Sequence, residues 1–101
     1  MRFRKEDLDK AILGLNNEPM IFAGDNVEIT YRNAILASLA RDDGQQDMDQ
    51  KIRCWTLIKK IMDDKADVIE LSSEDISFIK RRAAFLPPIP FGRLVDFLEG
   101  V

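Results

Sequence analysis

Three consecutive basic residues, Lys80, Arg81 and Arg82, lie between Phe78 and Phe85 in the stretch "LSSEDISFIKRRAAF". Guanidinium and ammonium groups bind phosphate oxygens and aromatic rings stack on bases, so this combination is suited to contact with a nucleic acid. Arginine and aromatic side chains are also enriched at the centres of protein–protein interfaces. Cations near the C-terminus of a helix favour the negative end of its dipole without any binding role. The cluster therefore has three interpretations.

A helical wheel separates the two sides of this stretch. The expected core face contains Ile76, Ile79, Ala83 and Leu86. Phe78 and Phe85 lie together on roughly the opposite face. Arg82 lies on one flank of this pair and Arg81 on the other, while Lys80 borders the core face. The candidate interaction surface is Phe78, Arg81, Arg82 and Phe85, and the alternative nucleic-acid contacts are Lys80, Arg81 and Arg82.

In the first interpretation the N-terminal strands cover Phe78 and Phe85, and Arg82 makes a cation–π contact with Phe78. In the second, the aromatic pair stays exposed for a protein partner or a second copy of the chain. Binding of nucleic acid, the third, is opposed by a net charge of −3. The second and third expected helices are also separated by about ten residues, unlike the short turn of a helix-turn-helix. The third and fourth have a short enough turn, but the last helix, "FGRLVDFLEG", offers one arginine and two acids. We expect a protein partner or self-association ahead of nucleic acid.

Catalytic chemistry is restricted by the absence of histidine and by a single cysteine, Cys54. These counts remove Ser-His and Cys-His nucleophile pairs and zinc sites of the His/Cys type. The five glycines are isolated, so no glycine-rich phosphate loop is present. Cys54 lies between apolar strips of an expected helix, where it fits as a small core residue. We expect a protein that is not an enzyme, with no catalytic residues, cofactor or metal.

The composition indicates one ordinary globular domain of 101 residues, 46% hydrophobic and 33% charged. The start, "MRFRKEDLDK", lacks the apolar stretch of a secretory signal. No run approaches the roughly 18 apolar residues of a membrane span. We therefore expect a cytoplasmic protein with no membrane contact.

Residues 1–29 are expected to form short strands and turns. The apolar runs Ile12 to Leu15 and Met20 to Ala23 are separated by Asn16-Asn17-Glu18-Pro19, a cluster of turn formers. Gly24-Asp25-Asn26 is a second turn signal, and the alternating Val27-Glu28-Ile29 follows it. This pattern predicts two or three short strands in a hairpin or small meander.

The helical part begins with Thr30 as the N-cap of a first helix, which ends before Asp42-Asp43-Gly44. Asp47 and Gln50 predict a capping box for a second helix. One face of that helix carries Met48, Ile52, Trp55, Ile58 and Met62, and a second strip carries Cys54, Leu57 and Ile61. Two apolar strips predict that this helix is central and buried on two sides.

Ser72 and Asp75 predict a second capping box, which starts the helix that carries the basic cluster. The prolines at 87, 88 and 90 prevent that helix from continuing. Phe91 to Leu98 is expected to form a short last helix that Gly100 ends. The predicted fold is mainly α (α+β), with about four helices over 30–99 and a small N-terminal β-hairpin or meander in one domain, 1–101.

The order of these segments also resembles a loose group of small proteins encoded in bacteriophages and prophages. The resemblance rests on "AILGL", "EPM", "EITYRNAILASLA", "KIRCWTLIKKIMD", "VIELSSEDISFIKRRAAF" and "GRLVDFLEG", which together cover most of the chain. The proline-rich "AAFLPPIPFG" departs from the glycine- and valine-containing link of that group. The resemblance implies a phage or prophage origin and an accessory or host-interaction role, and it supplies no catalytic residues.

Overall fold

The computed structural model describes residues 1–21, 27–42, 44–63 and 65–100. Its elements are β1 (Arg2–Arg4), α1 (Lys5–Leu8), α2 (Tyr31–Ala40), α3 (Met48–Ile61), β2 (Val68–Glu70), α4 (Ser73–Arg82), the 3-10 turn η1 (Ala83–Phe85) and α5 (Pro88–Glu99). The predicted class is confirmed, because the protein is mainly helical with a small antiparallel β element that contains the N-terminal strand.

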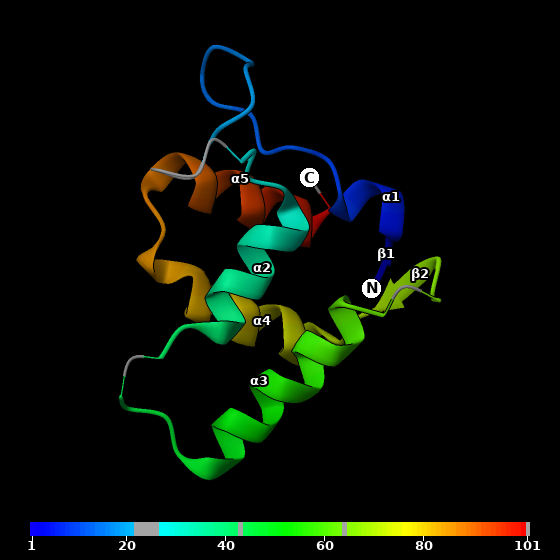
Figure 1. Cartoon of the computed structure of the whole chain (residues 1–101), viewed down its shortest axis with the longest axis vertical. Coiled ribbons are helices and arrows are strands. Elements are labelled where there is room, and N and C mark those ends of the chain that lie inside the picture. Colours follow the sequence, from blue (N-terminus) through cyan, green and yellow to red (C-terminus); the bar gives the residue numbers. More distant parts are fainter. Residues whose placement is uncertain (22–26, 43, 64, 101) are drawn as a thin grey trace.

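Helix α2 lies at the centre of the molecule (Figure 1) and packs against α1, α3, α4, η1 and α5. It begins where Thr30 was expected to cap it, since the Thr30 hydroxyl accepts a hydrogen bond from Asn33 N at 3.0 Å. The residues that it buries are Ala34, Ile35, Ser38 and Leu39. The Ser38 hydroxyl donates to the Ala34 carbonyl at 2.7 Å, so this buried polar group is satisfied.

The regular β ladder joins segments far apart in the sequence. β1 pairs antiparallel with β2, and buried Phe3 lies opposite buried Ile69. Isolated antiparallel bridges join residues 11 and 30, 13 and 19, and 21 and 28. The predicted turn at 16–19 is present, with Asn17 in the left-handed region (φ 62°) that asparagine tolerates. The expected turn Gly24-Asp25-Asn26 lies outside the described residues.

Both predicted capping boxes are confirmed. At the start of α3, Asp47 Oδ1 accepts from Gln50 N at 2.8 Å and Gln50 Oε1 accepts from Asp47 N at 3.2 Å. At the start of α4, Ser72 Oγ accepts from Asp75 N at 3.0 Å and Asp75 Oδ2 accepts from Ser72 N at 3.1 Å. Each box satisfies amide groups that a helix N-terminus would otherwise leave without partners.

Two boundaries differ from the prediction. Helix α5 begins at Pro88 rather than Phe91, because amides in the first helical turn have no intrahelical acceptor and prolines fit there at no cost. The first 29 residues also include one helical turn, α1, besides strands and turns. The end of α5 is as expected, with Gly100 in the left-handed conformation at φ 79°.

The prediction that α3 is central and buried on two sides is wrong. In Figure 1 it runs along one edge of the molecule, so that one long face points away from the other helices. Its buried strip is Cys54, Leu57 and Ile61. The other predicted strip is mostly exposed, since Met48, Ile52, Trp55 and Met62 each expose more than half of their surface.

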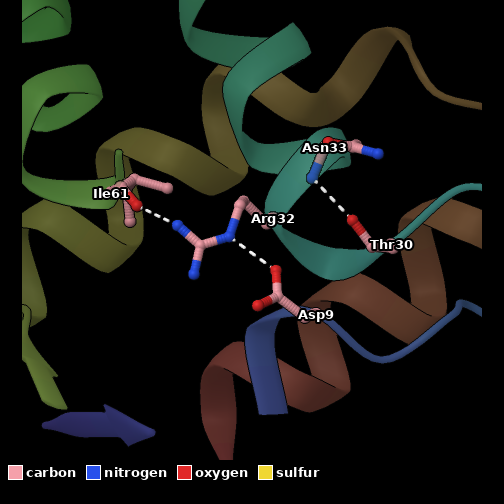
Figure 2. Close-up of polar contacts among 5 residues, drawn as sticks. All are labelled: Asp9, Thr30, Arg32, Asn33 and Ile61. Carbon is pink, nitrogen blue, oxygen red and sulfur yellow. Dashed lines mark hydrogen bonds and ion pairs between the residues drawn. The ribbon is translucent and has the colours of Figure 1, made fainter. Parts of the chain in front are cut away.

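Arg32 connects the ends of α1, α2 and α3 (Figure 2). Its Nε donates to Asp9 Oδ1 at 2.7 Å, and its Nη1 donates to the carbonyl of Ile61, the last residue of α3. A guanidinium at this position meets the negative end of the α3 dipole and satisfies a carbonyl that the helix leaves free. Arg32 therefore fixes the position of the C-terminal end of α3, whose exposed face forms one of the candidate surfaces.

Candidate functional site

The three residues of the basic cluster have separate surroundings. Lys80 forms an ion pair with Glu99 of α5. Arg82 is buried, with 7% of its surface exposed, and donates to the carbonyl groups of Ser38, at 3.2 Å, and Arg41. Arg81 is exposed, and its side chain has no hydrogen-bond or ion-pair partner among the described residues. The structure therefore does not place Lys80, Arg81 and Arg82 on one continuous basic surface.

The two rings of the expected aromatic pair also differ. Phe78 is a core residue, 6% exposed, and the guanidinium of Arg53 lies over its ring at 4.7 Å. Phe85 is half exposed, with the Arg41 guanidinium 5.1 Å from its ring centre. The N-terminal strands were expected to cover both rings and Arg82 to contact Phe78. Arginines of α3 and of the C-terminal end of α2 lie over the rings instead.

A hollow of about 320 Å³ lies between α3, α4 and the segment that joins α2 to α3. Arg41, Arg53, Arg81 and Arg82 line it. The remaining lining consists of Phe78 and three glutamines at positions 45, 46 and 50. We call this hollow the arginine pocket. It includes three of the four residues of the candidate interaction surface, and Phe85 and Lys80 are not part of its lining.

The walls of the arginine pocket are held by contacts within the protein. Arg53 Nη2 lies 3.5 Å from Asp75 Oδ1, and the same guanidinium lies over the Phe78 ring. In the amide orientation that satisfies both side chains, the Gln46 oxygen accepts from Arg82 Nη1 and Nη2 at 3.1 and 3.2 Å. These contacts hold the Arg53 and Arg82 guanidinium groups in place.

Asp75 carries a negative charge beside Arg53. Partial burial acts to raise the pKa of the Asp75 carboxyl, but hydrogen bonds from Ser72 and the charges of Lys60 and Arg53 outweigh burial and lower it. Asp75 is therefore ionised at neutral pH, where it both caps α4 and orients Arg53.

The second candidate surface is the exposed face of α3, formed by Met48, Ile52, Trp55 and Met62, which we call the α3 stripe. Spacings of three, four and seven residues align them along one side of the helix over about 21 Å, at 1.5 Å per residue. Two lysines, Lys51 and Lys59, accompany the stripe, and Lys59 Nζ lies 5.7 Å from the centre of the Trp55 ring. The surface thus combines apolar and positively charged groups.

A groove of about 250 Å³ borders the α3 stripe on the side of α2. Its lining includes Leu39, Cys54 and Ile58, with Lys51 and Trp55 shared with the stripe region. Leu39 and Cys54 belong to the core, so the groove brings core side chains to the edge of the stripe. The groove is a mostly apolar hollow beside Trp55.

The periodic pattern identified the residues of the α3 stripe but assigned them to the core. One feature of the sequence indicates that this face of α3 is exposed. On a helical wheel of α3, Lys59 lies between Trp55 and Ile52. A lysine is almost never fully buried without a partner. A strip with a lysine at its centre fits a surface better than a core.

Within the described residues, no group of three or more His, Cys, Asp or Glu side chains is placed to hold a metal ion. None of the described helices has the length and apolar character needed to cross a bilayer. The chain matches no protein-family model, no curated protein and no solved structure. The arrangement of its own side chains is therefore the basis for proposing a function.

Proposed function

We propose that this protein is a small non-enzymatic binding module that uses the α3 stripe to hold an amphipathic helix of another protein. The phage or prophage origin implied by the sequence resemblance suits an accessory or host-interaction protein. The observation that carries the proposal is the exposure of the stripe, in which Trp55 has 58% of its surface in contact with solvent.

An exposed row of large apolar side chains on one helix is unusual for a protein that acts alone. Single exposed apolar residues are common, but contiguous apolar patches mark interaction sites. Trp is among the residues that contribute most to binding energy, and Met adapts its shape to a partner. The stripe has the spacing with which one helix packs against another, and the groove beside Trp55 extends it.

Charge favours an acidic helix over a second copy of the chain. If two α3 stripes cross antiparallel at Trp55, Lys51 of one copy lies opposite Lys59 of the other. A parallel arrangement places each lysine near its own equivalent. Like charges that face each other across an interface oppose association, whereas acidic residues beside the apolar positions of a partner helix would pair with both lysines.

The proposal can be tested with a displayed library of amphipathic helical peptides whose flanking positions are randomised between acidic, neutral and basic residues. We expect the selected peptides to be acidic beside their apolar stripe. Trp55→Glu should weaken their binding by about 30-fold or more, the loss expected for removing a dominant contact.

Thr56→Glu is the matched control, because it adds the same charge to an exposed neighbouring position on α3 outside the stripe. Binding should survive this change. Peptides that bind Trp55→Glu as well as the wild type would refute the proposal, as would a library that yields no binder. Light scattering completes the test, because a wild-type dimer that Trp55→Glu dissociates would identify a second copy as the occupant.

A further inference from the structure

We infer that the arginine pocket is a binding site for a compact phosphate group, such as that of a small phosphomonoester, separate from the α3 stripe. Arg53 on α3 and Arg81 on α4 provide the contacts from two sides. This site does not depend on the proposed function, because it lies between α3 and α4 and shares no lining residue with the α3 stripe. Arg41 and Gln46 line both the pocket and the groove beside the stripe, but the phosphate contacts are assigned to Arg53 and Arg81, which do not line that groove.

The lining is rich in hydrogen-bond donors. Seven of its eight residues are arginine or glutamine, and each of these carries side-chain N–H groups. Guanidinium groups match phosphate oxygens with paired, charge-assisted hydrogen bonds. Such a concentration of arginine is notable on a chain with a net charge of −3. The volume of about 320 Å³ is in the range of small-molecule sites.

Arg53 is already oriented for this role. Its guanidinium lies over the Phe78 ring at 4.7 Å and within 3.5 Å of Asp75 Oδ1, which restricts the conformations of a long side chain. Less conformational entropy is lost when such a group binds a ligand. Arg81 is exposed beside it, without a hydrogen-bond or ion-pair partner among the described residues, and is available for an added anion.

A second hollow, of about 300 Å³, adjoins the arginine pocket through Arg53 and Arg81, which line both. Ser73 and Ser77 supply hydroxyl groups to its lining, and Glu74 supplies a negative charge. An anion held between Arg53 and Arg81 therefore has donors on both sides. Glu74 repels an anion in this second hollow. The phosphate is therefore expected in the arginine pocket, next to the glutamines.

The geometry favours a compact anion over a nucleic-acid strand. Lys80 points to Glu99 of α5 and Arg82 is buried against backbone carbonyls, so the cations do not form a track along the surface. A tetrahedral phosphate accepts hydrogen bonds from several directions, so it can bind the guanidinium groups of Arg53 on α3 and Arg81 on α4 together. A planar carboxylate is matched by the paired N–H groups of one guanidinium.

The test is a titration of the full chain with inorganic phosphate. Binding is monitored through the NMR chemical shifts of the backbone amides and of the arginine Nε–H groups. Saturable shifts are expected at Arg53 and Arg81. Arg81→Ala should weaken binding by about tenfold, the loss of one charged hydrogen-bonding partner. Arg81→Lys keeps the charge but not the forked pair of N–H donors, so its phosphate affinity should lie between those of the wild type and of Arg81→Ala.

Arg93→Ala is the control, because it removes one positive charge from α5, outside the pocket. It should leave phosphate binding unchanged. Shifts that do not saturate, or that Arg93→Ala weakens as much as Arg81→Ala does, would overturn the inference and indicate only a general ionic effect. Equal binding of acetate would overturn the choice of phosphate. Salt-sensitive binding of a single-stranded oligonucleotide without phosphate binding would identify a nucleic-acid surface instead.

Discussion

Arg41 and Arg82 exchange hydrogen bonds, with the side chain of each donating to the backbone carbonyl of the other. Arg41 Nη2 lies 3.3 Å from the Arg82 carbonyl oxygen, and Arg82 Nη2 donates to the Arg41 carbonyl. Arg41 is the C-cap of α2 and Arg82 is the last residue of α4. Each guanidinium therefore meets the negative end of the other helix and satisfies a carbonyl there. This reciprocal contact joins the central helix to the wall of the arginine pocket.

Arg82→Ala is expected to lower the free energy of unfolding by about 2 to 4 kcal/mol, because it removes the Arg82 donor from the buried carbonyl of Ser38 and the partly buried carbonyl of Arg41. Urea unfolding followed by circular dichroism measures the change. Arg81→Ala removes the same side chain one position earlier from an exposed site and should change stability by less than about 0.5 kcal/mol. Equal losses for the two variants would contradict this account.

Phe78→Ala and Phe85→Ala are expected to differ strongly, although the helical wheel places both rings on one face. Phe78 is buried beneath Arg53, so its removal should cost about 3 to 4 kcal/mol of unfolding free energy. Phe85 is half exposed, and its removal should cost less than about 1 kcal/mol. Thermal melts of the two variants provide the measurement. A loss at Phe85 as large as that at Phe78 would show that the 3-10 turn is packed differently.

The starts of α3 and α4 could be predicted because their cause is local. Asp47 and Gln50, like Ser72 and Asp75, are three residues apart, and each box depends only on that spacing. The start of α5 was predicted too late, because the helix-breaking effect of proline applies to the interior of a helix and not to its first turn.

The surroundings of Arg82 and of Trp55 could not be predicted in this way. The carbonyl partners of Arg82 lie about forty residues away in sequence. Periodicity shows that the face of α3 that contains Trp55 is apolar, but it does not show whether another part of the chain covers that face. For the candidate sites, the sequence pointed to Arg81 and Phe78 but did not bring Arg53 or Arg41 next to them.

Trp55 is the single tryptophan, so its fluorescence reports directly on the α3 stripe. Its emission is expected to be red-shifted in the folded protein and strongly quenched by acrylamide, because the indole is largely exposed. Trp55→Ala should change the unfolding free energy by less than about 1 kcal/mol. Leu57→Ala, on the buried strip of the same helix, should cost about 2 to 5 kcal/mol.

A blue-shifted emission that becomes red-shifted on dilution would indicate that another copy covers Trp55. A blue-shifted emission that does not change with concentration would contradict the exposure of the stripe altogether. The comparison with Leu57→Ala ensures that the unfolding assay detects the loss of a buried side chain from α3.

The ion pair between Arg32 and Asp9 is expected to contribute a measurable coupling energy to stability. Only 13% of the Arg32 side chain is exposed, and the hydrogen bond to the Ile61 carbonyl holds the guanidinium in place. A double-mutant cycle with Arg32→Ala and Asp9→Ala should give about 0.5 to 1 kcal/mol, measured by urea unfolding. The pair Lys10 and Asp7 lies on the exposed surface nearby and should give a smaller coupling. Equal values for the two cycles would show that Arg32 is not a fixed link between helices.

The stability of the protein should depend on the ionisation of Asp75 in acid. Its pKa is lowered in the folded state, because the hydrogen bonds from Ser72 and the nearby charges of Lys60 and Arg53 outweigh partial burial. The unfolded state, with an ordinary aspartate pKa of about 3.9, therefore takes up the proton first as the pH falls. The contribution of Asp75 is fully present at neutral pH and is lost as the pH falls from about 4 through the lower folded pKa.

Urea unfolding of the wild type and of Asp75→Asn between neutral pH and pH 2.5 measures this contribution. The difference in unfolding free energy between the two proteins should be constant near neutral pH and should shrink below about pH 4. Ser72→Ala removes the hydroxyl partner of Asp75 and should reduce the part of the difference that depends on pH. A difference that stays constant down to pH 2.5 would mean that Asp75 caps α4 equally well without its charge, and Arg53 would then need another partner to hold it over Phe78.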